Sequence, residues 1–198
     1  MTKPSTMTEL EAVNVLLTTI GESPVSTLSG NQVVDVAIAQ QVLLEVSREV
    51  QSMGWHFNTD IRVELSPSID TFIYVPTDTA RIDITNSSND IVARDGKLYN
   101  LTDKTFVFTD KLEAKIVYFY DFVKLPDVAK KYITTRASRI YADRLLNSSA
   151  IHQMLLRDEQ KAHVDLRQYE GEIADYNMNQ NYSVARVLNR GNYMRYST

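Results

Sequence analysis

The spacing of apolar residues changes twice along this chain of 198 residues, and no other feature of the sequence restricts its fold as strongly. Apolar side chains recur at helical spacing as far as residue 54, alternate with polar ones from 55 to 124, and return to helical spacing from 125 to 176. These patterns are typical of amphipathic helices and half-buried strands. We therefore expect an α+β fold, in which a bundle of about four helices carries an antiparallel β-sheet or barrel-like domain between helices two and three.

The N-terminal helical half is predicted to be residues 1–54. Thr8 and Glu11 have the spacing of a capping box, in which a hydroxyl and a carboxylate satisfy the free amides of a helix start. Gly21 suits the left-handed residue after a helix end, and Gly54 is placed to end a second helix. The apolar stripe of that second helix is Val34, Ile38, Val42, Val46, Val50 and Met53.

The β domain is predicted to be residues 55–124. Asp95 and Gly96 separate two apolar runs, and both residues tolerate the positive φ of a tight turn, so they indicate a β-hairpin. The other predicted strands are residues 61–65, 81–84, 105–109 and 114–120.

The C-terminal helical half, residues 125–176, is expected to pack on the N-terminal half. Pro126 suits the first turn of a third helix, and Asn147 opens a polar break before a fourth. The fourth helix has apolar residues at mixed three- and four-residue steps, a pattern typical of helices packed side by side. We expect it to pack on the third helix and also on the first two.

Residues 177–198 lose this periodicity and carry three arginines without any acidic residue. We expect an extended, flexible tail, because chain ends are disordered unless a neighbour orders them. Docking on a partner protein is the alternative interpretation. The residues that would carry it are Arg186, Leu188, Arg190, Tyr193, Arg195 and Tyr196.

The formal charge of −4 disfavours a general nucleic-acid binder, because affinity for phosphate needs clustered lysine and arginine. The charge is unevenly distributed. Residues 1–54 carry two basic and six acidic side chains, whereas residues 125–198 carry eleven basic and eight acidic ones. We therefore expect the two halves to attract each other, either within a subunit or between neighbouring subunits.

Catalytic and cofactor chemistry have little support in the sequence. The absence of cysteine removes disulfides, thiolate metal sites and a cysteine nucleophile. The chain has three histidines, and His152 and His163 are too far apart along one helix to share a metal ion. None of the six glycines falls into a phosphate-binding or nucleophile-elbow motif. We predict no catalytic residue, no metal site and no cofactor.

Glycoside cleavage is the enzymatic alternative, because it needs only two carboxyl groups several ångströms apart. The candidate pairs on the fourth helix are Asp158 with Glu159 and Glu170 with Glu172. Adjacent or alternate helix positions point to different faces, so we prefer to interpret these acids as a solvated surface.

The strand aromatics raise a second alternative, stacking on nucleic-acid bases. Acidic residues outnumber basic ones by eleven to eight in residues 55–124, so we interpret these aromatics as core. They are Tyr74, Tyr99, Phe106, Phe108, Tyr118, Phe119 and Tyr120.

Three segments resemble the tail tubular protein A family of short-tailed bacteriophages. They are residues 9–28 (ELEAVNVLLTTIGESPVSTL), 51–58 (QSMGWHFN) and 132–141 (YITTRASRIY), and the resemblance covers roughly residues 8–175. Residues beyond 176 do not share it. No single motif is chemically diagnostic, so the resemblance rests on the three segments and their order.

The resemblance implies a structural, non-enzymatic protein of the virion tail. Family members form a ring of about twelve copies below the portal, above a nozzle of tail tubular protein B and near the tail fibres, with genomic DNA only as cargo. No apolar run approaches about 18 residues, so we expect no membrane insertion and synthesis in the host cytoplasm. The alternatives are a tail-associated polysaccharide hydrolase and a helical interaction module unrelated to phages.

Overall fold

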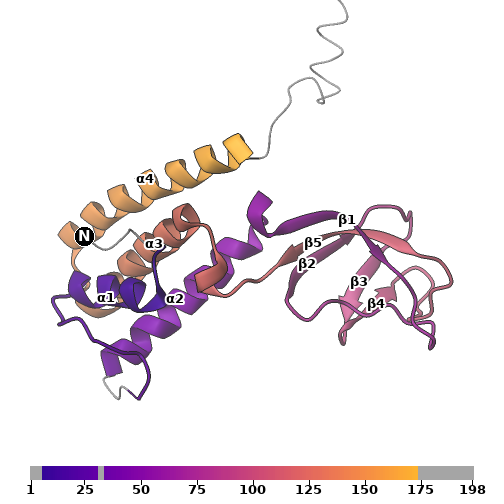
Figure 1. Ribbon diagram of the computed structural model, residues 1–198, viewed down its shortest axis with the longest axis horizontal. Coiled ribbons are helices and arrows are strands. Elements are labelled where there is room, and N and C mark those ends of the chain that lie inside the picture. Colours follow the sequence, from indigo (N-terminus) through magenta and orange to yellow (C-terminus); the bar gives the residue numbers. More distant parts are fainter. Residues whose placement is uncertain (1–5, 31–33, 174–198) are drawn as a thin grey trace, which may run out of the picture.

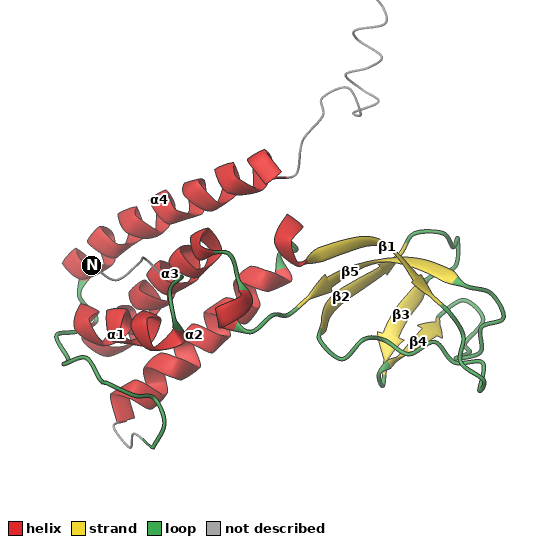
Figure 2. Cartoon of the chain, in the orientation of Figure 1, coloured by secondary structure: helices red, strands yellow, loops and turns green. Residues whose placement is uncertain are grey.

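The computed structural model describes residues 6–30 and 34–173 and confirms the predicted α+β class (Figure 1). Within those ranges the helices are α1 (Glu9–Thr19), α2 (Val34–Ser52), α3 (Asp127–Leu146) and α4 (Ser149–Ile173). The strands are β1 (Thr59–Leu65), β2 (Thr79–Ile84), β3 (Ile91–Arg94), β4 (Lys97–Asn100) and β5 (Leu112–Tyr118). The strands lie between α2 and α3 in sequence, and Figure 2 shows helices at one end of an elongated molecule and strands at the other.

The predicted capping box opens α1. The backbone N–H of Glu11 donates to Thr8 Oγ1 (3.2 Å), and the backbone N–H of Thr8 donates to Glu11 Oε2 (2.7 Å). At the other end Gly21 has a φ of +88°, and the N–H of Glu22 donates to the carbonyl of Leu17 (3.0 Å). Local sequence therefore determines both ends of this helix.

Helix α3 lies at the centre of the helical part. It packs on α1 and α2 on one side, and α4 lies along its other side (Figure 1). The predicted packing of the fourth helix on the third is confirmed. Ala162 and Leu166 of α4 also share the apolar core with α1 and α2, but α4 has few direct contacts with those two helices. The most deeply buried apolar side chains of this core include Ala12, Val13, Leu16, Leu17, Ala129, Ile133, Ala137, Tyr141 and Leu166.

Ion pairs join α2 to α3. Arg144 Nη2 lies 2.9 Å from Glu45 Oε1, and Arg136 Nη2 lies 2.6 Å from Glu49 Oε1. We expected the acidic and basic halves to attract each other either within a subunit or between neighbouring subunits. These ion pairs form within one subunit. The pair of Arg144 with Glu45 is exposed and worth at most about 1 kcal/mol, so it contributes less to stability than the apolar core does.

The described strands form two small antiparallel sheets. β5 is the central strand of a sheet with the order β1-β5-β2, and β3 pairs with β4. Asp95 and Gly96 connect β3 to β4 with φ values of +51° and +71°, so the predicted hairpin is confirmed. The strands and their loops enclose a second apolar core, formed by Leu65, Ile73, Leu98, Phe108, Leu112, Ala114 and Ile116.

Two strand predictions are wrong: one predicted strand does not form, and another has different ends. Residues 105–109 form no strand in the described structure, because Thr105 makes an isolated bridge to Asn100 and the N–H of Phe108 donates to the carbonyl of Thr71 (2.9 Å). The last strand runs from Leu112 to Tyr118 rather than from residue 114 to residue 120. Beyond Tyr118, the N–H of Phe119 donates to the carbonyl of Asp78 (2.7 Å), and the backbone N–H and carbonyl of Tyr120 bond to the side chain of Gln51 on α2.

Candidate functional site

The chain crosses between the helices and the sheet twice, once after α2 and once after β5 (Figure 2). We define the joint as residues 51–59 and 118–121. Asn58, which is 1% exposed, lies within the joint. Its side-chain amide donates to the carbonyls of Gln51 (2.9 Å) and Tyr118 (2.8 Å), and its Oδ1 accepts from the N–H of Trp55 (2.9 Å). One buried side chain therefore ties the two crossings together.

Gln51, on the last turn of α2, makes a second buried link. Its amide donates to Ser47 Oγ (3.0 Å) and to the carbonyl of Tyr120 (3.0 Å), and its Oε1 accepts from the N–H of Tyr120 (2.7 Å). A buried polar group left unpaired costs about 1–3 kcal/mol. Bending the joint would break several such bonds at once, so the sheet is held at a fixed angle to the helices.

Gly54 occupies a position in the joint that requires glycine. Its φ is +77°, and a Cβ atom there would lie 2.9 Å from Arg81 Nη2 and 3.1 Å from Val117 Cγ2. The left-handed conformation costs other residues about 1–2 kcal/mol. The prediction that Gly54 ends the second helix is confirmed, and the close contacts add a reason that the sequence does not show.

We expect Gly54→Ala to lower the free energy of unfolding by about 2 kcal/mol, through backbone strain and crowding together. Gly171→Ala is the matched control, because Gly171 lies in α4 and its added Cβ would meet no atom within 4 Å. That change should raise stability by up to about 1 kcal/mol through helix propensity. Urea denaturation measures both variants, and effects of the same sign would contradict the role given to Gly54.

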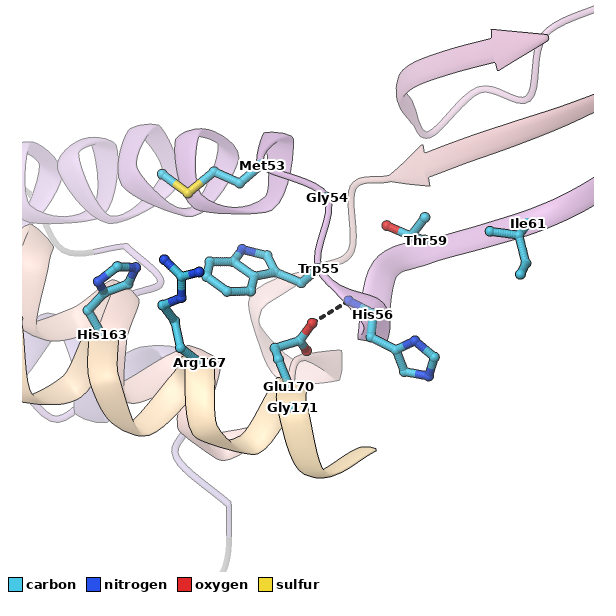
Figure 3. A pocket seen from close by; sticks show the side chains of 10 residues that line it. All are labelled: Met53, Gly54, Trp55, His56, Thr59, Ile61, His163, Arg167, Glu170 and Gly171. Carbon is cyan, nitrogen blue, oxygen red and sulfur yellow. Dashed lines mark hydrogen bonds between the residues drawn. The ribbon is translucent and has the colours of Figure 1, made fainter. Parts of the chain in front are cut away.

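A cleft of about 610 Å³ opens beside the joint, between the end of α2, the start of β1 and the last turns of α4. We name it the joint cleft; Figure 3 shows its lining. The indole N–H of Trp55 donates to the carbonyl of Val50 (2.7 Å), and His163 meets the Trp55 ring edge-on, with centroids 6.3 Å apart. The backbone N–H of His56 donates to Glu170, which attaches α4 to the joint (Figure 3).

Two polar atoms in the wall of the joint cleft lack partners. Glu170 Oε1 and Thr59 Oγ1 are buried and form no hydrogen bond with any described residue. In Figure 3 the guanidinium of Arg167 extends toward Trp55 and His163, away from the Glu170 carboxylate. The cleft thus has an aromatic wall, and these two oxygens are buried behind its surface.

A separate network of ion pairs surrounds Glu159 on α4. The Glu159 side chain is 8% exposed and lies between Arg136, whose Nη1 is 2.7 Å from Oε1, and Arg139, which donates to Oε2. Burial raises the pKa of Glu159, but hydrogen bonds from Arg139 and Arg136 outweigh burial and hold that pKa below its ordinary value. Glu159 is therefore a buried anchor between helices.

The carboxylates considered for glycoside cleavage do not form a pair of free acids. Asp158 is exposed while Glu159 is buried between two arginines, so these neighbours face different surroundings. Glu170 accepts from His56 in the joint cleft, whereas Glu172 is exposed and accepts from Gln168 (3.0 Å). The interpretation as a solvated surface is wrong for Glu159 and Glu170 and fits Asp158 and Glu172.

The interpretation of the strand aromatics as core is only partly correct. Phe108 is 8% exposed, but Tyr74 and Tyr120 are 52% and 36% exposed. Tyr74 lies at the rim of the β3–β4 hairpin, where the Lys97 ammonium is 5.5 Å from its ring centroid. The period of a strand does not reveal whether both of its faces are covered, and this caused the error.

The candidate docking residues Arg186, Leu188, Arg190, Tyr193, Arg195 and Tyr196 lie outside the described residues. Over residues 6–30 and 34–173, no group of three acidic or histidine side chains is placed to hold a metal ion. None of the helices in the described part of the chain combines the length and hydropathy needed to cross a membrane.

The chain is similar to known proteins over most of its length. The sequence profile of the tail tubular protein family matches residues 10–176. Tail tubular protein A of Klebsiella phage KP34 is 30% identical over 140 residues, which make up 70% of this chain and 74% of that protein. The family match includes the helices, the sheet and the joint, and it ends before the tail.

Proposed function

Because the chain belongs to the tail tubular protein family, the structural proteins of bacteriophage tails, we propose that it is a ring-forming adaptor between portal and nozzle. In this proposal about twelve copies form a ring that lines part of the DNA conduit. The portal lies on one side and a nozzle of tail tubular protein B on the other, with tail fibres attached nearby. The subunit is made in the host cytoplasm and joins the virion tail.

The buried hydrogen bonds of the joint are the observation that carries this proposal. The joint connects two separate apolar cores, one among the helices and one among the strands. We treat residues 1–54 and 125–176 as one body and residues 55–124 as the other. An adaptor must hold surfaces for two different neighbours at a fixed distance, and the buried bonds of Gln51 and Asn58 supply that fixed relation.

The charges of the helical body support a conduit that does not retain DNA. Arg136, Arg139 and Arg144 are each paired with a carboxylate of the same subunit. Arginines paired in this way are less available to phosphate, and the chain as a whole has a net charge of −4. Such a wall favours passage of DNA over binding.

Electron microscopy of the purified chain mixed with its portal tests the proposal directly. We expect rings with the portal's symmetry seated on one portal face, with the sheet bodies pointing away from it. A chain that stays monomeric and leaves the portal bare would refute the adaptor role. It would favour the alternative of a helical interaction module.

Removing residues 177–198 is expected to leave the fold intact and to weaken portal binding by roughly tenfold or more, the loss of one or two interface anchors. The truncation removes no residue of the described helices and strands, so urea denaturation should show that the fold is retained. Surface plasmon resonance on immobilised portal rings measures the affinity. Equal affinities for the truncated and full chains would exclude the tail from the portal interface.

We also propose that the chain is not a glycan hydrolase, because Glu159 and Glu170 are engaged in structural contacts. Incubation with capsular and cell-wall polysaccharide should release no reducing ends. Release that Glu170→Gln abolishes would contradict this proposal and assign an acid to the joint cleft.

A further inference from the structure

The turn after β1 exposes two side chains at the end of the sheet body that points away from the helices (Figure 1). Ile69 is 102% exposed, more than any other large apolar side chain of the described residues, and the adjacent Asp70 is exposed as well. We name these two residues the knob. Full exposure of an isoleucine is unfavourable in a free subunit and is relieved when a neighbouring molecule covers it.

Three backbone hydrogen bonds hold this turn in one conformation. The N–H of Thr71 donates to the carbonyl of Ser68 (2.9 Å), that of Ser68 to the carbonyl of Phe72 (2.8 Å), and that of Phe108 to the carbonyl of Thr71 (2.9 Å). Thr71 has a φ of +64°, a left-handed conformation that costs a residue of this kind about 1–2 kcal/mol. Such strain persists only where the surrounding structure holds it, so the turn is a rigid mount for the knob.

The joint cleft offers an apolar surface that matches an isoleucine. Met53 and Ile61, which are 48% and 69% exposed, form its wall together with the indole of Trp55 (Figure 3). The cleft volume of about 610 Å³ has room for the tip of a turn, not only for one side chain. Docking of the knob there would remove apolar surface from water on both partners.

Arg167 is the accessible charge of the joint cleft. Its side chain is exposed, and no ion pair among the described residues includes it. The carboxylate of Glu170 lies behind the surface, because its Oε1 is buried and it accepts from the backbone N–H of His56. The guanidinium extends toward Trp55 and His163, so an anion that meets it also meets the aromatic wall (Figure 3). The cleft therefore fits an anion that is adjacent to an apolar side chain.

We propose that the knob of one copy docks in the joint cleft of the next copy, with Ile69 on the apolar wall and Asp70 paired with Arg167. The inference deepens the proposed function, since it assigns the contact between neighbouring copies of the ring, and it rests on that function for the ring alone. Because the turn is already held in place, docking orders little additional chain, which favours the contact.

A subunit cannot fill its own cleft with its own knob. Ile61 lines the cleft, Leu65 at the end of β1 is four residues or about 13 Å further along the strand, and the knob lies beyond it. The buried bonds of the joint keep the sheet from folding back. Knob and cleft are different surfaces, so each copy uses its knob on one neighbour and its cleft on the other. Contacts of this heterologous kind form a ring when the rotation between copies closes.

The chain has no cysteine, so two introduced thiols can test the contact without background. In Ile69→Cys/Ile61→Cys, each copy carries one thiol on the knob and one in the cleft. A short bismaleimide should join the copies into a ladder of covalent oligomers when portal rings are present and, at high protein concentration, in the chain alone. Ile69→Cys/Val164→Cys is the matched control without a ladder, because Val164 is 62% exposed but lies outside the cleft.

Exchange of the two charges tests the ion pair. In the double-cysteine chain, Asp70→Arg or Arg167→Asp should raise the protein concentration needed for half of the crosslinking by about tenfold or more. An equimolar mixture of these two variants should restore the ladder, because each knob then finds a cleft of opposite charge on the other chain. Arg157→Asp is the control without effect, since Arg157 is exposed on α4 outside the cleft.

The outcomes separate this contact from the adaptor role. Rings seated on the portal without a ladder would overturn the knob contact and leave the adaptor proposal standing. A ladder that neither charge variant weakens, or that the mixture of variants does not restore, would overturn the contact in the same way. A ladder that responds to the charges while the portal stays bare would keep the contact and refute the adaptor role. Neither ladder nor rings would overturn both.

Discussion

Replacing Glu159 by alanine is expected to lower the free energy of unfolding by about 3–5 kcal/mol, because it leaves two partly buried arginines without their shared anion. Arg136 and Arg139 have side chains that are 22% and 16% exposed, so water replaces the lost carboxylate only in part. Urea denaturation measures the change. The same loss should raise the rate of proteolysis within α4, since α4 packs mainly on α3.

Glu45→Ala is the matched control for this prediction. Glu45 also pairs with an arginine of α3, but the side chains of Glu45 and Arg144 are 55% and 48% exposed. An exposed pair is worth about 0–1 kcal/mol, so this variant should unfold almost as the unchanged chain does. If both variants lost the same stability, burial would not be the reason for the effect.

The same carboxylate predicts sensitivity to acid. The pKa of Glu159 is lowered in the folded chain from its ordinary value of 4.5, because the arginine hydrogen bonds outweigh burial. Its contribution to stability is therefore fully present above the unfolded value and is lost as the pH falls through the folded one. Glu159→Gln should show a shallower decline in stability below that value, as urea denaturation at a series of pH values measures.

The changes of hydrophobic period predicted the fold class because each element obeys its local pattern. Thr8 and Glu11 formed the expected cap, and Asp95 with Gly96 formed the expected turn. The failures lie where a tertiary contact overrides the pattern. In place of the strand predicted at 105–109, Thr105 pairs with Asn100 at the end of β4 and Phe108 bonds to Thr71 in a loop, and no local rule contains that information.

The joint could not be predicted from the sequence. Gln51 and Asn58 are polar residues at the end of a helical pattern, where exposure is the ordinary expectation, yet they are 2% and 1% exposed. They are buried because the chain returns at Tyr118 and Tyr120, some sixty residues later, and presents backbone groups to them. Only the closed fold shows that these amides have partners.

The hydrogen bonds of the joint and the ion pairs of Glu159 stabilise different parts of the molecule. The ion pairs hold α4 on the helical core, whereas the amides of Gln51 and Asn58 set the position of the sheet. A variant that weakens the first should impair the helical body, and one that weakens the second should loosen the sheet. Under the proposed function, the first variant should impair docking on the portal, and the second should impair docking on the nozzle.

Asn58→Asp is expected to destabilise the chain by about 3–5 kcal/mol at pH 7, although the two side chains have nearly the same shape. The amide nitrogen of Asn58 lies 2.9 Å from the carbonyl oxygen of Gln51 and 2.8 Å from that of Tyr118. Aspartate would place a charged acceptor against two acceptors in a buried site. Lowering the pH should recover part of the loss, because a protonated carboxyl can donate to one of the carbonyls.

Asn86→Asp provides the comparison, since Asn86 is exposed and its Oδ1 accepts from the N–H of Glu113 (2.8 Å), which a carboxylate can also do. Its amide nitrogen makes only a long bond to the carbonyl of Lys111 (3.5 Å), where water can replace the lost donor. This variant should change stability by less than about 1 kcal/mol. Urea denaturation at pH 7 and pH 4 measures both variants. An Asn58→Asp chain as stable as Asn86→Asp at pH 7 would show that the joint bends to avoid the repulsion. A joint that bends in this way could not hold two neighbours of a ring at a fixed separation, so the result would also count against the adaptor proposal.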